Sequence, residues 1–413
     1  MDEVKPVKQK EKIPWRIGFG LFLGVVGWFL PYAGLNVTLL PAQINSVDPV
    51  HKVQWIAMFA TVAMIVAAIA NLVAGALSDR TRTRFGKRTP WIVLGTLATV
   101  VLLFAISMSH TIPMLLLFWS LYQISLNCVV ASVAALLADV VDPKLRGTVS
   151  TFMGIGTTVG NYGSGLIAAH FIVHIRVGIW VFALLAVIIE GLAIFLIKEP
   201  GNKEVARPEV KKLIDVVKMF SLPKKGAHDF YYALIGRFLM IAGTHMILGY
   251  QLYIFTDYMK LSSGETGSYI ARMSSIMLIG GVICCFFAGP IADKIGHYKL
   301  PVVGTTITVA IGAVIPFFTP DPWTMMAFAV IAGFSMGVYN AVDQALLVSI
   351  LPNKDEAAKD LGILNLANTV GNIMGPVLAS TVISVLGYKF MFPAEAAVVL
   401  LSGFLISRIK GVK

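Results

Sequence analysis

The stretch Gly75-Ala-Leu-Ser-Asp79-Arg-Thr-Arg-Thr-Arg-Phe-Gly86-Lys-Arg-Thr-Pro90 places one acid, five cations and two glycines between two long apolar runs. A shorter version, Gly289-Pro-Ile-Ala-Asp293-Lys294, ends another apolar run in the second half of the chain, and Gly296 there corresponds to Gly86. The two acids are 214 positions apart and the two later glycines 210 positions apart. The spacing predicts a duplicated unit whose first copy has four extra loop residues.

Apolar runs on both sides of these loops exclude a soluble enzyme. Of 413 residues, 57% are hydrophobic and only 13% are charged, with a mean hydropathy of +0.80; soluble chains have about a quarter charged residues. Because about 20 apolar residues cross a bilayer as a helix, the composition predicts an all-α membrane protein with twelve spans. The spans are expected at residues 16–44, 53–78, 90–109, 112–138, 148–173, 177–197, 231–257, 267–292, 301–319, 322–350, 361–386 and 389–408.

The duplication continues beyond the loops. Ala135-Leu-Leu recurs as Ala345-Leu-Leu, and Thr158-Val-Gly-Asn161 recurs as Thr369-Val-Gly-Asn372. Two six-span copies related by an axis along the membrane normal resemble the major facilitator fold, whose substrate site lies at the midplane between the halves. We therefore expect a tail at 1–15, a first bundle at 16–197, a central loop at 198–230, a second bundle at 231–408 and a tail at 409–413.

The net charge of +11 follows the membrane topology and does not indicate a nucleic-acid partner. Of the 33 Lys and Arg residues, 27 fall in alternate connections and in the tails. Loops on the cytoplasmic side of a membrane carry an excess of Lys and Arg. We therefore predict that the protein lies in the cell membrane, with both tails and the central loop on the cytoplasmic side.

The first loop, with its lengthened spacing between Asp79 and Gly86, resembles the glycoside-pentoside-hexuronide:cation symporters and the related plant-type sucrose transporters. Ala135-Leu-Leu-Ala-Asp139 and Asp142-Pro-Lys-Leu-Arg146 resemble the sucrose-transporter side. This resemblance implies transport of a sugar together with a cation. The melibiose-type sodium symporters have acids in spans one and two, whereas this chain has only amides there, which argues against sodium coupling by that site.

The loop motif is interpreted as a cytoplasmic gate, in which opposite charges latch neighbouring helices and glycines allow close approach. A solvated loop without a gating role is the alternative. The gate residues would be Gly75, Asp79, Arg80, Arg84, Gly86, Arg88 and Asp293.

Two acids are candidates for carrying the coupling proton, because a carboxyl group inside a membrane is costly and usually functional. Asp343 lies deep in span ten, with a structural hydrogen-bonded role as the alternative. Asp139 matches an acid to which the sucrose-transporter resemblance assigns proton coupling, yet it could instead pair with Arg80 or Arg146. Arg237 and Arg272 lie inside spans and are candidate charge partners; Glu190, His245 and Glu395 are lesser candidates.

The polar side chains left inside the spans suggest what is transported. Amide groups beside flat aromatic rings suit a neutral, multiply hydroxylated ligand. Hydrogen bonding between helices is the alternative role for each amide. The candidate substrate residues are Trp28, Tyr32, Asn36, Tyr122, Gln123, Asn127, Asn340, Gln344, Gln251, Asn365 and Asn368.

The sequence therefore predicts a secondary active transporter, a proton-coupled symporter of a sugar or glycoside that works by alternating access. One alternative is a proton-driven exporter of drugs or metabolites with the same fold, and another is an integral membrane transferase. We expect no enzyme activity, cofactor or metal, and we expect a single chain to suffice. A transferase would need a cluster of metal-binding acids or a nucleophile with a base, and the sequence has no convincing one.

Overall fold

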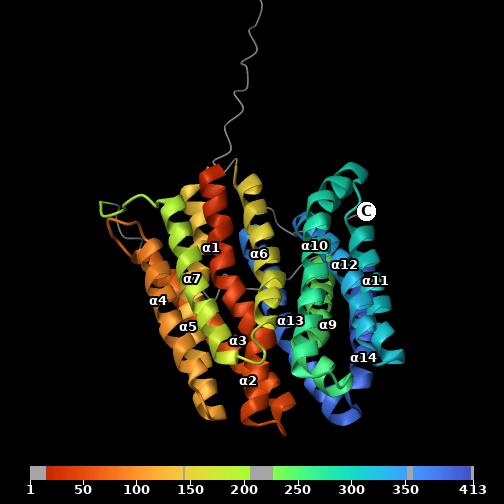
Figure 1. Cartoon of the computed structure of the whole chain (residues 1–413). Coiled ribbons are helices and arrows are strands. Elements are labelled where there is room, and N and C mark those ends of the chain that lie inside the picture. The colour runs from red at the N-terminus through yellow and green to blue at the C-terminus, as the bar shows by residue number, and fades with distance from the viewer. Residues whose placement is uncertain (1–14, 143–144, 205–226, 351–356, 411–413) are drawn as a thin grey trace, which may run out of the picture.

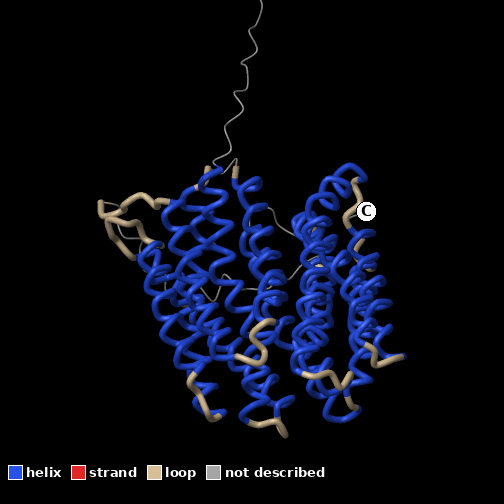
Figure 2. Tube along the Cα trace, viewed as in Figure 1, coloured by secondary structure: helices blue, strands red, loops and turns tan. Residues whose placement is uncertain are grey.

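The computed structural model describes residues 15–142, 145–204, 227–350 and 357–410. These residues form long helices joined by short loops, and none of them forms a strand (Figure 2). In lipid every backbone polar group must be satisfied within the protein, which helices achieve inside each segment. The predicted all-α membrane fold is confirmed.

The first half of the chain forms six helical segments, which we call the first bundle. Its opening segment is continuous but changes geometry, from α1 (Trp15–Gly34) through the π-helix η1 (Leu35–Leu39) to α2 (Leu40–Val47). The other five are α3 (Lys52–Arg80), α4 (Thr89–Ser107), α5 (Ile112–Val140), α6 (Arg146–Ala169) and α7 (Ile175–Ile197).

The second half repeats this plan in a second bundle. Its opening segment also contains a π-helix, which here forms the end of the segment: α9 (His228–Tyr253) runs into η2 (Ile254–Tyr258). The following helices are α10 (Ser263–Ile295), α11 (Lys299–Phe318), α12 (Pro322–Ser349), α13 (Ala357–Leu386) and α14 (Tyr388–Ser407). Most of the predicted central loop and parts of both tails lie outside the described residues.

Among the described residues, eleven helical segments are long and apolar enough to cross a membrane. The twelfth, α6, is as long as its neighbours but carries many Gly, Thr and Ser residues along Arg146–Ala169. Small residues of this kind let helix backbones approach closely. Accordingly, α6 packs against α1 within its own bundle and against α10 of the other bundle.

The two bundles meet along two pairs of helices, α6 with α10 and α3 with α13 (Figure 1). The start of α1 and the end of α14 lie at one end of the molecule, which we call the termini end (Figure 1). Here Arg16 donates to the carbonyl of Leu196 and Lys299 to that of Ile409. The opposite end, which includes the loop at 48–51 and the turn before Tyr388, is called the far end.

Pro31 lies in the last turn of α1, shortly before η1. Proline has no N–H group, so the carbonyl of Gly27, four residues earlier, lacks its usual helical donor. Single π-helical turns inside α-helices are often found at functional sites. In this protein they stand beside the interface between the bundles, where η1 packs against α9.

Candidate functional site

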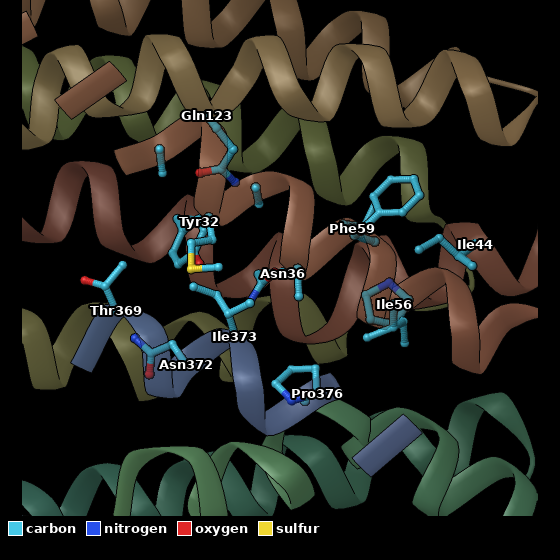
Figure 3. A pocket seen from close by; sticks show the side chains of 17 residues that line it. Tyr32, Asn36, Ile44, Ile56, Phe59, Gln123, Thr369, Asn372, Ile373 and Pro376 are labelled. Carbon is cyan, nitrogen blue, oxygen red and sulfur yellow. The ribbon is translucent and has the colours of Figure 1, made fainter. Parts of the chain in front are cut away.

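A central cavity lies between the two bundles. Its walls come from α1, η1, α2, α3 and α5 of the first bundle and from α9 and α13 of the second. Figure 3 shows Asn372, Ile373 and Pro376 of α13 facing the side of the cavity formed by Tyr32 and Asn36. The cavity therefore lies where a ligand would contact both halves at once.

The lining of the central cavity is apolar with a few polar groups. Apolar side chains such as Phe59 and Met64 form most of it, and the aromatic ring of Tyr32 joins them. Amide and hydroxyl groups come from both bundles, and none of the described lining residues carries a charge. The polar side chains are Asn36, Gln123, Thr369 and Asn372.

Three of the predicted substrate residues line this cavity: Tyr32, Asn36 and Gln123. Thr369 and Phe59 line it without having been predicted. A signal for Thr369 did exist, because it begins the repeated Thr-Val-Gly-Asn motif. Phe59 offered none, since one apolar ring in an apolar span cannot be told from its neighbours.

The other predicted substrate residues lie elsewhere. Asn127 accepts from Asn71 at 3.2 Å, Gln251 donates to Thr38 at 3.5 Å, and Asn340 is exposed. The remaining ones fall into three groups: Trp28 and Tyr122 line a smaller cavity inside the first bundle, Asn368 contacts Arg237, and the side chains of Gln344 and Asn365 lie outside the described part of the structure.

Arg237 and Asp343 form a buried ion pair between α9 and α12. Arg237 Nε lies 3.2 Å from Asp343 Oδ2, and both side chains are 5% exposed. Arg237 Nε also donates to Asn368 Oδ1 at 2.9 Å, directly before the cavity residue Thr369 on α13. Arg272, the other predicted partner, is exposed and stacks over the ring of Tyr269.

Asp139 belongs to a cluster of charges at the termini end, within the first bundle. Its carboxylate accepts from Lys87 Nζ and from Arg88 Nε, each at 2.8 Å. Arg88 also bonds to Asp79 and to the hydroxyl of Ser78. Arg146 instead donates to the carbonyls at the end of α5. Among the predicted gate residues, Arg80 and Arg84 are exposed, and the side chain of Asp293 lies outside the described part.

Glu199, which was not predicted, organises the loop that carries this cluster. Its carboxylate accepts from the backbone N–H groups of Lys87, Arg88 and Thr89 at 2.7 to 3.0 Å, at the start of α4. A negative charge at a helix N-terminus satisfies free donors and complements the helix dipole. Gly86 is held against Glu199 with φ of +88°, a conformation that favours glycine.

At the far end, polar contacts join the two bundles beyond the central cavity. Lys52 Nζ lies 2.8 Å from Asp257 Oδ2, which also accepts from Tyr388. The hydroxyl groups of Tyr250 and Tyr253 donate to the carbonyls of the first bundle at 2.8 Å. We call these residues the far-end latch: Lys52, Asp257, Tyr388, Tyr250 and Tyr253.

Comparison with known sequences supports a transporter. A family model described as MFS/sugar transport protein matches residues 15–353. The multidrug resistance protein MdtG of Salmonella paratyphi C is 24% identical over 389 residues, which is 91% of each chain. The MdtG protein of Salmonella typhimurium strain LT2 is similar to the same extent.

Two solved structures share the fold. A bacterial homolog of the human lysosomal transporter Spinster, in an inward-facing and occupied conformation, matches with a TM-score of 0.72 at 14% identity and covers 97% of this chain and 98% of that one. The human organic anion transporter MFSD10 matches with a TM-score of 0.67 at 14% identity and covers 96% of this chain and 100% of that one.

Proposed function

Because the chain belongs to the MFS/sugar transport protein family, we propose that this secondary transporter moves a neutral, hydroxylated molecule of the sugar or glycoside class through its central cavity. Membership in the family makes it a multi-pass membrane transporter and not an enzyme. The substrate, the coupling ion and the direction of transport are the parts that we propose.

One observation carries the choice of substrate: the described lining of the central cavity has no charged side chain. Amides and a hydroxyl from both bundles can each donate and accept hydrogen bonds, which matches a ligand with several hydroxyl groups. The ring of Tyr32 offers a flat apolar surface of the kind on which a sugar ring can stack. An anionic or cationic substrate would find no opposite charge there.

We place proton coupling at the Arg237–Asp343 pair. Protonation of Asp343 would remove its charge and leave Arg237 held by Asn368 alone, one residue from the cavity wall at Thr369. Such a change in a buried pair alters the balance between two conformations. Among the described residues that line the central cavity neither Asp343 nor Asp139 appears, so the coupling would act through α13. Asp139 is proposed as a secondary proton carrier, within the cluster that includes Asp79 and Arg88.

Alternating access then requires the far-end latch and the termini end to open in turn. From the distribution of Lys and Arg we propose that both tails face the cytoplasm, so the latch would close the extracellular side. The charged cluster at Asp79, Arg88 and Asp139 is proposed as the cytoplasmic gate. The central cavity is built from one chain, so we propose that a monomer transports.

Export of drugs is the second candidate function. It is favoured by the relatives named as multidrug resistance proteins and by the largely apolar wall of the cavity. An apolar, adaptable surface of this kind suits varied amphipathic ligands.

Reconstitution into liposomes distinguishes the two candidates. The protein is given an inward proton gradient, labelled mono- and disaccharides and an interior pH dye. Sugar-dependent acidification of the interior is the expected result. If amphipathic cations leave the liposomes against their gradient and no sugar alters the interior pH, the exporter is the correct function. Sugar uptake without acidification would remove proton coupling and leave the substrate class intact.

A further inference from the structure

A second cavity lies inside the first bundle, where α1, α4, α5 and α7 meet. It is much smaller than the central cavity. The wall is apolar except for a few side chains, which are Thr96 and Thr99 of α4, Tyr122 of α5 and Glu190 of α7. This space is distinct from the central cavity, and the transport mechanism proposed above does not use its carboxyl group.

Four buried oxygen atoms of residues that line this cavity have no hydrogen-bond partner in the protein. They are both carboxyl oxygens of Glu190, the hydroxyl of Tyr122 and the hydroxyl of Thr96. Glu190 is only 2% exposed. Buried polar atoms in proteins nearly always have partners, so a concentration of unpartnered oxygens around one small space indicates a site for a small species.

The charge balance of the cavity indicates that this small species is a proton. No described lining residue is a cation, whereas the buried Asp343 has Arg237 as its partner. Among the described residues that line this cavity, α1 contributes Gly27, Trp28 and Pro31, α4 contributes two threonines, and Tyr122 of α5 is the one titratable group besides Glu190. An ionised carboxylate without a partner is very costly in such surroundings.

Glu190 packs against the turn of α1 that carries Gly27. Glu190 Oε1 lies 2.7 Å from the position that a Cβ atom on Gly27 would occupy, so the acid rests against this turn of α1. The carbonyl of Gly27 lacks its helical donor because Pro31 has no N–H group. A carboxylic acid can donate one hydrogen bond, which a carboxylate cannot.

The two cavities share walls. On α1, Pro31 lines the inner cavity and Tyr32 the central one, and on α5 the same is true of Tyr122 and Gln123. Stacked rings also connect the two cavities. The ring centroids of Tyr32 and Trp119 are 6.4 Å apart, and those of Trp119 and Tyr122 are 5.2 Å apart. A ligand that moves Tyr32 would therefore disturb the surroundings of Glu190.

We propose that Glu190 is a proton-binding site of the transporter and that occupancy of the central cavity changes its proton affinity. The carboxylate takes a proton from hydronium and releases water, and the reverse step unloads it. This site is separate from Asp343, and the proposal rests on the proposed function only in treating the central cavity as the place where a substrate binds.

Infrared difference spectroscopy of the full chain in lipid nanodiscs tests the proton site without any substrate. Because Glu395 is also fully buried with unpartnered carboxyl oxygens, protonated acids should give a carbonyl band with more than one component. One component should be lost in Glu190→Gln and retained in the matched variant Glu395→Gln. Tyr122→Phe should keep the band and shift its frequency, which supports the assignment even if Glu190→Gln does not fold. A Glu190→Gln spectrum identical to that of the wild type would overturn it. Loss of the band in NaCl but not in KCl would make it a sodium site.

The link to the central cavity is tested with a cysteine-free parent that carries Ala60→Cys in the cavity wall. Modification with a methanethiosulfonate reagent fills the cavity whatever the natural substrate is. Modification should shift the pH midpoint of the Glu190 band, and the shift should correspond to a change of at least about fivefold in proton affinity. Reagent added to the cysteine-free protein without Ala60→Cys should have no effect. An unchanged midpoint would overturn the coupling. Failure of sugar transport in liposomes would contradict only the proposed substrate.

Discussion

Buried acids in this protein differ in one respect that decides their chemistry: whether a cation lies beside them. Asp343 has Arg237 at 3.2 Å, whereas the two oxygens of Glu190 have no partner in the protein. A neighbouring cation favours the charged form of an acid while burial opposes it, whereas an unpaired acid in apolar surroundings is stable only when neutral. The two acids are therefore suited to different steps of one cycle.

Replacing Asp343 by Asn leaves Arg237 buried without an anion. We expect a loss of about 3 to 5 kcal/mol in the free energy of unfolding, together with loss of uphill uptake while exchange continues. Denaturant unfolding in detergent and the liposome assay measure the two effects. The double variant Arg237→Gln/Asp343→Asn should regain much of the stability but no uphill uptake. A double variant as unstable as the single one would show that packing, and not charge, is responsible.

Glu199→Gln removes the negative charge from the start of α4. We expect it to lower the free energy of unfolding by about 1 kcal/mol, because three backbone N–H groups lose a charged acceptor. Thermal unfolding followed by tryptophan fluorescence measures the change. Glu204→Gln, at an exposed position a few residues further on, is the matched control. Equal stability of the two variants would contradict the capping role.

Where helices of the two bundles pack against each other, their close contact depends on glycines, which have no side chain. A Cβ atom on Gly267 of α10 would lie 2.6 Å from the carbonyl oxygen of Ala169 in α6. Gly264, one turn earlier on the same helix, has open space around it. Backbone contact of this kind permits close helix packing, and it holds α6 and α10 together towards the far end.

Gly267→Leu should therefore push α6 and α10 apart and favour the conformation that is open at the far end. Spin labels at His110→Cys and Leu386→Cys, both exposed at this end, report the separation between the bundles in a cysteine-free parent. The distance distribution should gain a longer component in Gly267→Leu and remain unchanged in Gly264→Leu. The same distribution in both variants would mean that this contact does not control opening.

Across the molecule as a whole, the far end is held by contacts that cross between bundles. Lys52 contacts Asp257 and also lies over the ring of Tyr253, with its side chain only 14% exposed. Asp257 in turn accepts from Tyr388 at the start of α14. These residues come from three separated parts of the chain, so the latch can form only when both bundles are docked at this end.

Lys52→Met should weaken the latch and shift the conformational balance by about 1 kcal/mol, or roughly fivefold. In a cysteine-free parent with Ala60→Cys, an impermeant thiol reagent added from the far-end side should react faster once Lys52 is replaced. Lys260→Met, at an exposed position at the same end, should react at the parental rate. No acceleration in Lys52→Met would remove the latch from the mechanism.

Neighbouring amides on one helix show where prediction from sequence stops. Gln123 and Asn127 lie one turn apart on α5, yet Gln123 lines the central cavity whereas Asn127 bonds to Asn71 of α3. The rotation of α5 against its neighbours decides between these two roles, and an amide in an apolar span has no local feature that reports it. Glu199 and Lys52 were missed for a related reason, since their partners are more than a hundred residues away.

Apolar length, charge placement and the internal repeat were sufficient to predict twelve helices and a transporter architecture. Amides beside aromatic rings inside the spans predicted Tyr32, Asn36 and Gln123, which line the central cavity. The lipid environment makes this possible. Each spanning segment must form its backbone hydrogen bonds within itself, so it can be recognised from its own stretch of sequence. The choice of Arg237 over Arg272 as the partner of Asp343, the isolation of Glu190 and the far-end latch appeared only once the helices were packed. These features depend on distances between separate helices, and such distances are a property of the assembled bundles.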